Sequence, residues 1–209
     1  MLKNTKYGST TWTDGFWKER FELCQNSILP NIYSLLDDKE LSHNLENFKI
    51  ASGLTKGDFN GPSFGDGDFY KWLEGASYVY GKTKDKDLGE LLDNLIEMIA
   101  KIQREDGYIY TENVIQILHG QKIEEGVNSF TFQAYNLGHL ISAGCVHYRM
   151  CGKQNLLKVA IKAGNYLACV YERASKTHDV NTAICPSHYI GLIDLYETVN
   201  DKRYLEAAS

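Results

Sequence analysis

The sequence predicts an all-α fold, in which successive helical hairpins form part of an (α/α)6 toroid. Apolar residues recur at helical spacing almost throughout the chain. A loose repeat of long helix, two-residue turn and long helix also runs along it. Fourteen Tyr, three Trp and eight Phe stand against only three Pro, a composition typical of long helices that carry amphipathic aromatic residues.

The expected elements follow the apolar pattern in order. A first helix covers the stripe from Phe16 to Leu36, and Pro30 kinks or divides it because proline removes a backbone donor. The glycine-rich segment 53–67 is expected as a long loop. The alternating stretch Tyr108 to Thr111 is expected to pair as a strand. Further helices are expected at 40–51, 68–80, 85–104, 129–150, 154–172 and 186–199, with a short final segment after 201.

The repeat places polar residues at equivalent helix starts. Asp68 and His139 each lie thirteen positions before a Gly-Lys turn, and 71 residues separate them. Ser187-His188 begins a third copy, in which Tyr204-Leu205 match Leu156-Leu157 at an interval of 48. An open solenoid keeps a nearly fixed period of about 34–47 residues, so the unequal intervals favour a closed toroid. In a toroid these starts converge on one rim, as a sugar pocket requires.

The length points to an incomplete ring. Six hairpins need about 300 residues, whereas this chain has 209 and stops one turn into a helix. We therefore expect residues 1–209 to be the N-terminal portion of a barrel domain. The competing interpretation is a natural short protein with an open groove. Apolar faces left uncovered by a partial barrel are expected to promote self-association.

Composition limits the partners. A net charge of −5 and a pI near 5.7 argue against nucleic acid, which needs a basic surface. No apolar run approaches the roughly 18 residues of a membrane span, and no signal peptide is visible. Five cysteines at irregular spacing, without a CxxC pair, suit free thiols. We therefore expect a cytoplasmic protein.

Several stretches carry a family resemblance, in the right order and over nearly the whole chain. The most specific is DGDFYKWLE at 66–74. The others are FWKER at 16–20, NFKIA at 47–51, QREDGYIYT at 103–111, GHLI at 138–141, His188, LYE at 195–197 and KRYL at 202–205. On these residues the chain resembles the β-L-arabinofuranosidases of glycoside hydrolase family 127.

The resemblance implies a six-hairpin barrel followed by β-sandwich domains, acting on furanosides or related plant sugars. It also implies a retaining reaction with a zinc-bound cysteine nucleophile and a glutamate acid/base. Those residues match no position up to Ser209, so we assign no catalytic residue and no cofactor to this chain. Zinc is expected in the full-length family enzyme. The sequence departs from the family at Gly67, where members have Ser, and at 186–191, PSHYIG in place of GHPEIE, which leaves the exact sugar open.

Four residues are candidates for binding the sugar. His139 and His188 match family histidines that line the sugar site, and imidazole both donates and accepts hydrogen bonds. The alternative is a histidine that bonds backbone groups at a helix start. Asp66 and Asp68 are candidate acceptors for hydroxyl groups, although Asp68 is equally suited to cap the following helix.

Other patterns have structural explanations of at least equal weight. Tyr70 and Trp72 are suited to stack on a sugar, but their helical spacing with Leu73 is more typical of core residues. His147 and Cys151 are four residues apart on one helix, which resembles half a metal site or a packed core pair. Two other functions stay open: a noncatalytic helical-repeat interaction module, and another toroid enzyme such as a sugar epimerase or lyase.

Overall fold

The computed structural model describes residues 5–123, 132–177 and 185–209, and within these ranges every regular element is a helix. The prediction of an all-α fold is therefore confirmed. The elements are α1 (Gly15–Leu23), the π-helical turn η1 (Cys24–Ile28), α2 (Leu29–Asp37), α3 (Asn44–Ala51), α4 (Gly65–Thr83), α5 (Lys86–Ile102), α6 (Thr111–Leu118), α7 (Gln133–Cys151), α8 (Asn155–Thr177), α9 (Ser187–Val199) and α10 (Lys202–Ala207).

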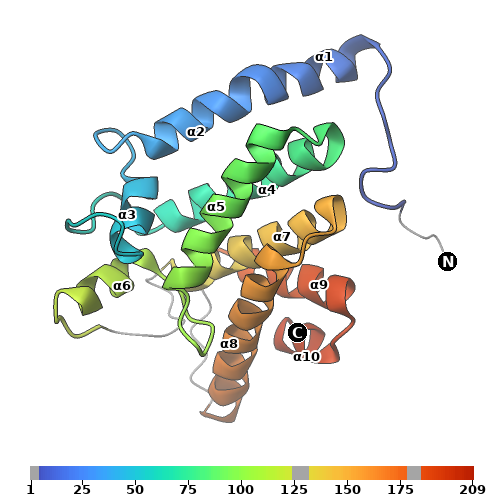
Figure 1. Ribbon diagram of the computed structural model, residues 1–209. Helices are drawn as coiled ribbons and strands as arrows, with labels where there is room; N and C mark the ends of the chain where they lie inside the picture. Colours follow the sequence, from blue (N-terminus) through green and yellow to red (C-terminus); the bar gives the residue numbers. More distant parts are fainter. Residues whose placement is uncertain (1–4, 124–131, 178–184) are drawn as a thin grey trace.

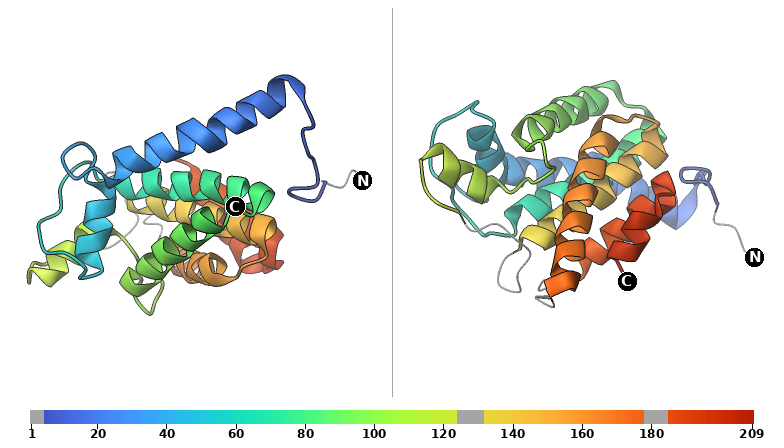
Figure 2. Two further views of the ribbon diagram at one scale, coloured as in Figure 1. Left: turned by 45° about the horizontal axis from the view of Figure 1, so that its top comes forward. Right: turned by 90° about the horizontal axis from the view of Figure 1, so that it is seen from below.

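Three hairpins organise the molecule: α4–α5, α7–α8 and α9–α10. Their first helices form one layer, in which α7 packs between α4 and α9. The second helices α5 and α8 cross in front of this layer in Figure 1, and α10 packs against α8 and α9. The views in Figure 2 show the same arrangement from two further directions. This alternation of inner and outer helices is that of a toroid segment.

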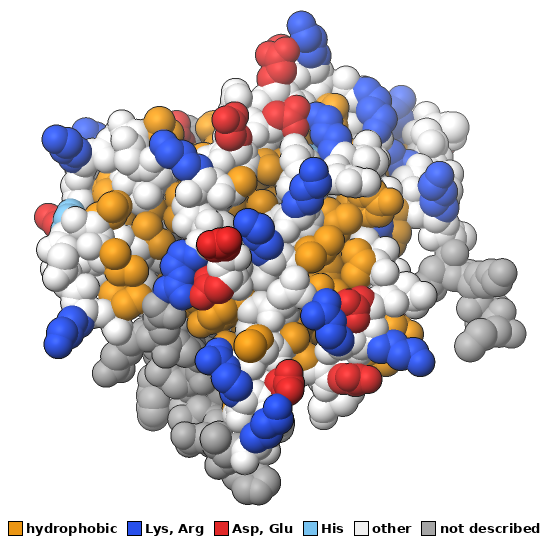
Figure 3. Space-filling model, turned by 60° about the horizontal axis from the view of Figure 1, so that its bottom comes forward, with side chains coloured by type: hydrophobic (Ala, Val, Ile, Leu, Met, Phe, Trp, Pro, Cys, Tyr) orange, Lys and Arg blue, Asp and Glu red, His pale blue; other side chains and the backbone are white. Residues whose placement is uncertain are grey.

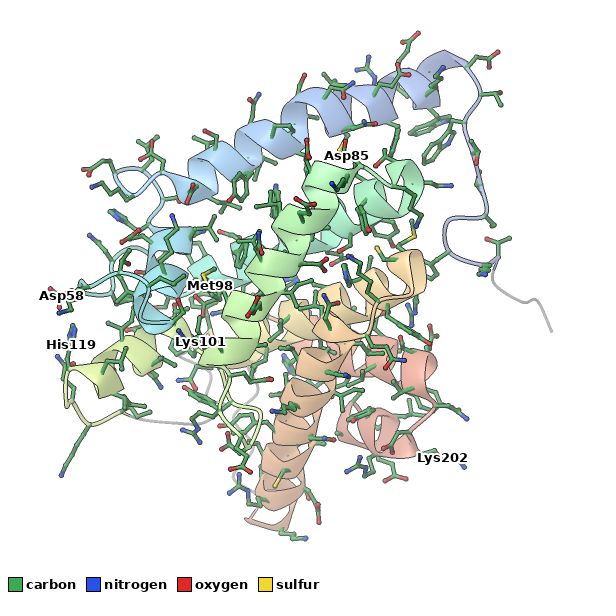
Figure 4. All side chains as sticks on the ribbon, viewed as in Figure 1. Asp58, Asp85, Met98, Lys101, His119 and Lys202 are labelled. Atoms are coloured by element: carbon green, nitrogen blue, oxygen red, sulfur yellow. The ribbon has the colours of Figure 1, made fainter. Side chains whose placement is uncertain are left out.

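All three hairpin turns contain a left-handed residue, and in two of them, α4–α5 and α9–α10, a capping aspartate follows it. Lys84 ends α4 with φ +55°, and the Asp85 carboxylate accepts a hydrogen bond of 2.8 Å from Leu88 N at the start of α5 (Figure 4). Asn200 ends α9 with φ +58°, and Asp201 caps α10 through Arg203 N in the same way. The predicted turn at Gly81-Lys82 is wrong, because α4 continues to Thr83 and turns only where Lys84 adopts the left-handed conformation.

The core lies between the inner layer, α3 and the outer helices. Phe48 of α3 packs edge-on against Phe69 of α4 at 4.8 Å between ring centres. Tyr70 and Trp72 are 1% and 5% exposed, which supports their interpretation as core residues. Trp72 also donates from Nε1 to the carbonyl oxygen of Leu29 at 3.0 Å, and this bond ties α2 to α4.

The segment 108–111 is not a strand, which corrects the expectation. The side chains of Tyr108, Ile109 and Tyr110 are all buried, so the expected alternation of exposed and buried faces does not occur. Thr111 begins α6, a helix that the sequence pattern did not predict. The expected helix at 129–150 begins instead at Gln133, and residues 124–131 lie outside the described residues.

The expected break at Pro30 is accommodated without a sharp separation. Pro30 is the second residue of α2, and Leu29 separates it from the π-helical turn η1. Proline lacks a backbone N–H and its ring clashes with the preceding turn of a regular α-helix, and the wider π turn before it relieves that clash. Figure 1 shows α1 and α2 running on in nearly one direction across the edge of α4.

The surface carries mixed charge. Acidic and basic side chains alternate across the face in Figure 3, with apolar side chains exposed between them. None of the described helices has both the length and the apolar character needed to cross a lipid bilayer.

Candidate functional site

The first turns of α4, α7 and α9 lie side by side. Asn136 of α7 accepts a hydrogen bond from Gly67 N of α4 at 3.0 Å. Ser187 of α9 donates to the carbonyl oxygen of Tyr135 in α7, also at 3.0 Å. These bonds hold three helix N-termini in one row, so their leading side chains share one edge of the inner layer.

Two glycines allow this close approach. A Cβ on Gly67 would lie 2.8 Å from Tyr135 Cε1, and one on Gly138 would lie 2.4 Å from His188 N. Both separations are far below ordinary van der Waals contact, so a larger residue requires the neighbour to shift. The departure from the family pattern at Gly67 therefore falls at the contact between α4 and α7.

Asp66 is directed into the protein. Its side chain is buried and accepts hydrogen bonds from the backbone N and the Oγ1 of Thr111, at 2.9 and 2.6 Å. Burial raises the pKa of Asp66 to about 6, and the two bonds from Thr111 counteract part of that rise. The carboxyl group thus joins the start of α4 to the start of α6.

Asp68 and His139 belong to one cluster of polar and aromatic side chains. Asp68 pairs with Lys71 at 2.8 Å, and Lys71 Nζ lies 5.2 Å from the ring centre of Tyr135. The Tyr135 ring meets the half-buried His139 ring edge-on, at 4.6 Å. The capping alternative for Asp68 is wrong, because Phe64 occupies the cap position and Asp68 lies inside the first turn of α4.

His139 is uncharged at neutral pH. Burial lowers the pKa of its imidazole to about 4, the neighbouring Lys71 acts in the same direction, and Asp68 opposes them. A neutral imidazole has one donor and one acceptor nitrogen. Together, Asp68, Lys71 and His139 offer acceptors and donors within a small area, which suits a ligand with several hydroxyl groups.

The side chain of His188 packs against aromatic residues of α8 and α9. Its ring is fully buried, 3.8 Å from the Tyr189 ring centre and 5.7 Å from that of Tyr171. Neither of its nitrogens makes a hydrogen bond to the described part of the chain, nor does the buried Tyr171 hydroxyl. Burial lowers the pKa of His188, and the nearby Cys185 backbone offsets part of this effect. Within the described residues, these polar atoms therefore lack the partners that buried groups normally have.

His147 and Cys151 both bond to Ser77. His147 Nδ1 lies 2.8 Å from Ser77 Oγ, and the Cys151 thiol donates to the Ser77 carbonyl oxygen at 3.6 Å. Over the described ranges, no group of three or more His, Cys, Asp or Glu side chains could hold a metal ion.

The sequence reasoning missed Lys71 and Tyr135, the two residues that join Asp68 to His139. Their spacing held a signal, since Lys71 is three residues after Asp68 and Tyr135 is four residues before His139. Residues at these spacings are neighbours on a helix surface. The contact between α4 and α7 that brings the two pairs together has no such pattern in the sequence.

Comparisons with known proteins identify the family. The family described as β-L-arabinofuranosidase, GH127 catalytic domain, matches residues 9–209. The non-reducing end β-L-arabinofuranosidase of Bifidobacterium longum subsp. longum is 30% identical over 217 residues, which cover 94% of this chain and 32% of that protein.

Two solved structures are also similar. The crystal structure of a GH127 β-L-arabinofuranosidase from Geobacillus stearothermophilus T6 has a TM-score of 0.83 at 29% identity, covering 95% of this chain and 31% of that one. A GH127 β-arabinofuranosidase has a TM-score of 0.76 at 29% identity, covering 97% and 32%. The chain thus spans about a third of the length of these relatives. The family match runs over nearly every residue, so the chain belongs to glycoside hydrolase family 127 and covers part of its β-L-arabinofuranosidase catalytic domain, as a segment of the helical toroid.

Proposed function

We propose that residues 1–209 are the first part of a β-L-arabinofuranosidase barrel and supply side chains that bind a terminal arabinofuranose or related plant sugar. The observation that carries this proposal is the cluster of Asp68, Lys71, Tyr135 and His139 across the adjoining starts of α4 and α7. The Bifidobacterium relative is named for action at the non-reducing end. By analogy, the furanose bound here is the terminal sugar, and the cleaved bond joins it to the rest of the glycan.

Each side chain has a chemical part in this proposal. Asp68 accepts hydrogen bonds from sugar hydroxyl groups, and the neutral His139 both donates and accepts them. His188 receives a hydroxyl group on one of the two nitrogens that have no partner among the described residues, since an unsatisfied buried polar atom costs about 1–3 kcal/mol. Asp66 stabilises the start of α4, next to Asp68, through its hydrogen bonds to Thr111.

The hydrolytic step belongs to other residues in this proposal. The resemblance implies a nucleophilic cysteine and an acid/base glutamate, and in this proposal both lie outside residues 1–209. Zinc, which the family resemblance implies, does not fit the described side chains, because no three of their His, Cys, Asp or Glu groups gather at one place. This chain binds and orients the sugar, and we expect it to be inactive alone.

The test is the affinity of the chain for methyl β-L-arabinofuranoside, measured by ligand-observed NMR. We expect saturable binding, and we expect His139→Ala to weaken it about tenfold or more, because a site that hydrogen-bonds a ligand is left with unpaired groups. His119→Ala is the matched control. His119 is 38% exposed at the end of α6, where it faces Asp58 at 3.2 Å (Figure 4).

Three results would contradict the proposal. Equal binding by the wild type and His139→Ala would remove His139 from the site. Robust hydrolysis of an aryl β-L-arabinofuranoside by the chain alone would show that catalytic groups are present. Complete absence of sugar affinity would favour the noncatalytic helical-repeat module.

We also propose that the chain self-associates through apolar side chains at its open edges. Ile190 and Ile193 of α9 are 57% and 42% exposed, and Ile28, Ile32 and Leu35 along η1 and α2 are 44%, 42% and 53% exposed. Contiguous apolar surface of this kind favours association.

A further inference from the structure

A row of aromatic rings leads away from His139 to the surface. His139 meets Tyr135, Tyr135 meets Phe132 at 5.7 Å between ring centres, and Phe132 meets Phe64 at 5.4 Å. The rings come from two separate parts of the chain, since Phe64 precedes α4 and the other three lie at the start of α7. Every contact is edge-to-face, the favourable arrangement for such pairs.

Phe64 is the exposed end of this row. Its side chain is 39% exposed. A T-shaped contact covers at most one face of a ring, so the contact with Phe132 leaves Phe64 a face for another partner. A single exposed apolar residue is ordinary. Phe64 differs because unbroken ring contacts connect it to the proposed sugar-binding residues.

The backbone around Phe64 is held in place. Asn136 donates from Nδ2 to the Ser63 carbonyl oxygen at 2.9 Å, and Gly65 N donates to the Pro62 carbonyl oxygen at 2.9 Å. Asn136 is the same residue that accepts from Gly67 N. One side chain of α7 therefore fixes the backbone on both sides of Phe64. A residue whose backbone is already fixed loses less conformational entropy when it binds a ligand.

We infer that Phe64, backed by Phe132, forms a second subsite that receives the ring following the arabinofuranose across the glycosidic bond. This inference rests on the proposed function. Because the sugar bound at Asp68 and His139 is the terminal one in that proposal, a second ring belongs to the leaving group. We assign the subsite to the next sugar of the glycan, whose C–H face packs on an aromatic ring while its hydroxyl groups stay in water.

The experiment compares three ligands of the wild-type chain: methyl β-L-arabinofuranoside, 4-nitrophenyl β-L-arabinofuranoside and a disaccharide with β-L-arabinofuranose at its non-reducing end. We expect the two ligands with a second ring to bind about three- to tenfold more tightly than the methyl glycoside, the range that one aromatic contact provides. Phe64→Ala is expected to abolish this advantage and to leave the dissociation constant of the methyl glycoside within about twofold.

Two further variants complete the test. Phe64→Tyr is expected to keep the advantage because it keeps the ring, which guards against a change caused by local misfolding. Phe16→Ala is the matched control: Phe16 is 60% exposed and also makes a T-shaped contact, with Trp17 on α1, outside the row. It is expected to change none of the three affinities.

The outcomes separate this inference from the proposed function. Equal affinity of the wild type for all three ligands overturns the subsite and leaves the sugar site standing. Retention of the advantage by Phe64→Ala does the same. Failure of the wild type to bind any of the ligands overturns the sugar site, and the subsite with it.

Discussion

The inner layer of α4, α7 and α9 and the long first helix of α1, η1 and α2 are both rich in apolar residues, yet they are buried to opposite extents. Phe69, Leu73 and Leu140 in the inner layer have no exposed surface. On α1 no residue is buried, and Phe16 and Trp17 are 60% and 66% exposed. Apolar residues at helical spacing therefore identify a helix but not what covers it.

Close contact between backbones explains the difference. Gly138 of α7 approaches the start of α9 so closely that a side chain there would overlap its backbone. The first helix is held through side chains instead: Trp72 of α4 donates to the Leu29 carbonyl oxygen, and Leu29 and Leu36 are buried. The inner layer is thus a tightly packed unit, whereas the first helix presents an uncovered apolar face.

The largest expected effect comes from adding one carbon to the tight contact. Gly138→Ala puts a Cβ 2.4 Å from His188 N and should destabilise the protein by about 3 kcal/mol or more, because two helix backbones must separate. Gly75→Ala on α4 is the matched control. Its new Cβ would lie 3.9 Å from Leu29 Cδ1, and replacing a helical glycine should stabilise the protein by about 0.5–1 kcal/mol. Urea unfolding of the three proteins measures both changes, and equal midpoints would show that the inner layer is not tightly packed.

An intermediate effect is expected from buried titratable groups in the inner layer. Burial lowers the pKa of His147 from 6.5 to about 4, and Lys153 adds to this effect. As pH falls, the unfolded chain takes up this proton before the folded one does. The stabilising contribution is therefore complete above pH 6.5 and is lost as pH falls toward 4. The loss for this residue should be on the order of 2 kcal/mol.

Two substitutions should change this pH profile in opposite directions. His147→Asn removes the titrating group and should flatten the loss of stability between pH 6.5 and 4. Asp66 has a pKa raised to about 6, so its protonation favours the folded state as pH falls. Asp66→Asn should therefore steepen the loss. Urea unfolding at several pH values measures both slopes, and parallel profiles for the two variants would refute the burial argument.

Local spacing predicted what lies along a helix and failed at contacts between helices. The all-α architecture and the turns at Gly152 and Asn200 follow from periodicity and from residues that tolerate left-handed backbone. The turn after α4 was misplaced because Gly81 is glycine for packing: a Cβ there would meet Met150 at 2.8 Å. The sequence alone did not distinguish a turn glycine from a packing glycine.

The candidate site divides in the same way. The sequence identified Asp68 and His139 as helix starts, but the contact that joins them crosses from α4 to α7. The bond from Thr111 to Asp66 joins residues 45 positions apart, so no periodic pattern encodes it. The aromatic row from Phe64 to Tyr135 also depends on tertiary structure.

The smallest effect on stability, with the clearest effect on assembly, is expected on the first helix. Ile28→Asp combined with Ile32→Asp should lower the free energy of unfolding by about 1 kcal/mol, because each side chain is only partly buried, at 44% and 42% exposed. The same pair should weaken self-association at least tenfold, since each aspartate places a charge within the proposed apolar contact. Sedimentation velocity over a range of concentrations measures this change, with Lys86→Asp on the exposed side of α5 as a charge-altering control.

A wild-type chain that stays monomeric at high concentration would contradict the proposed association. A double variant that unfolds would show instead that the first helix is held by its apolar face, and the contrast with the inner layer would then be one of degree.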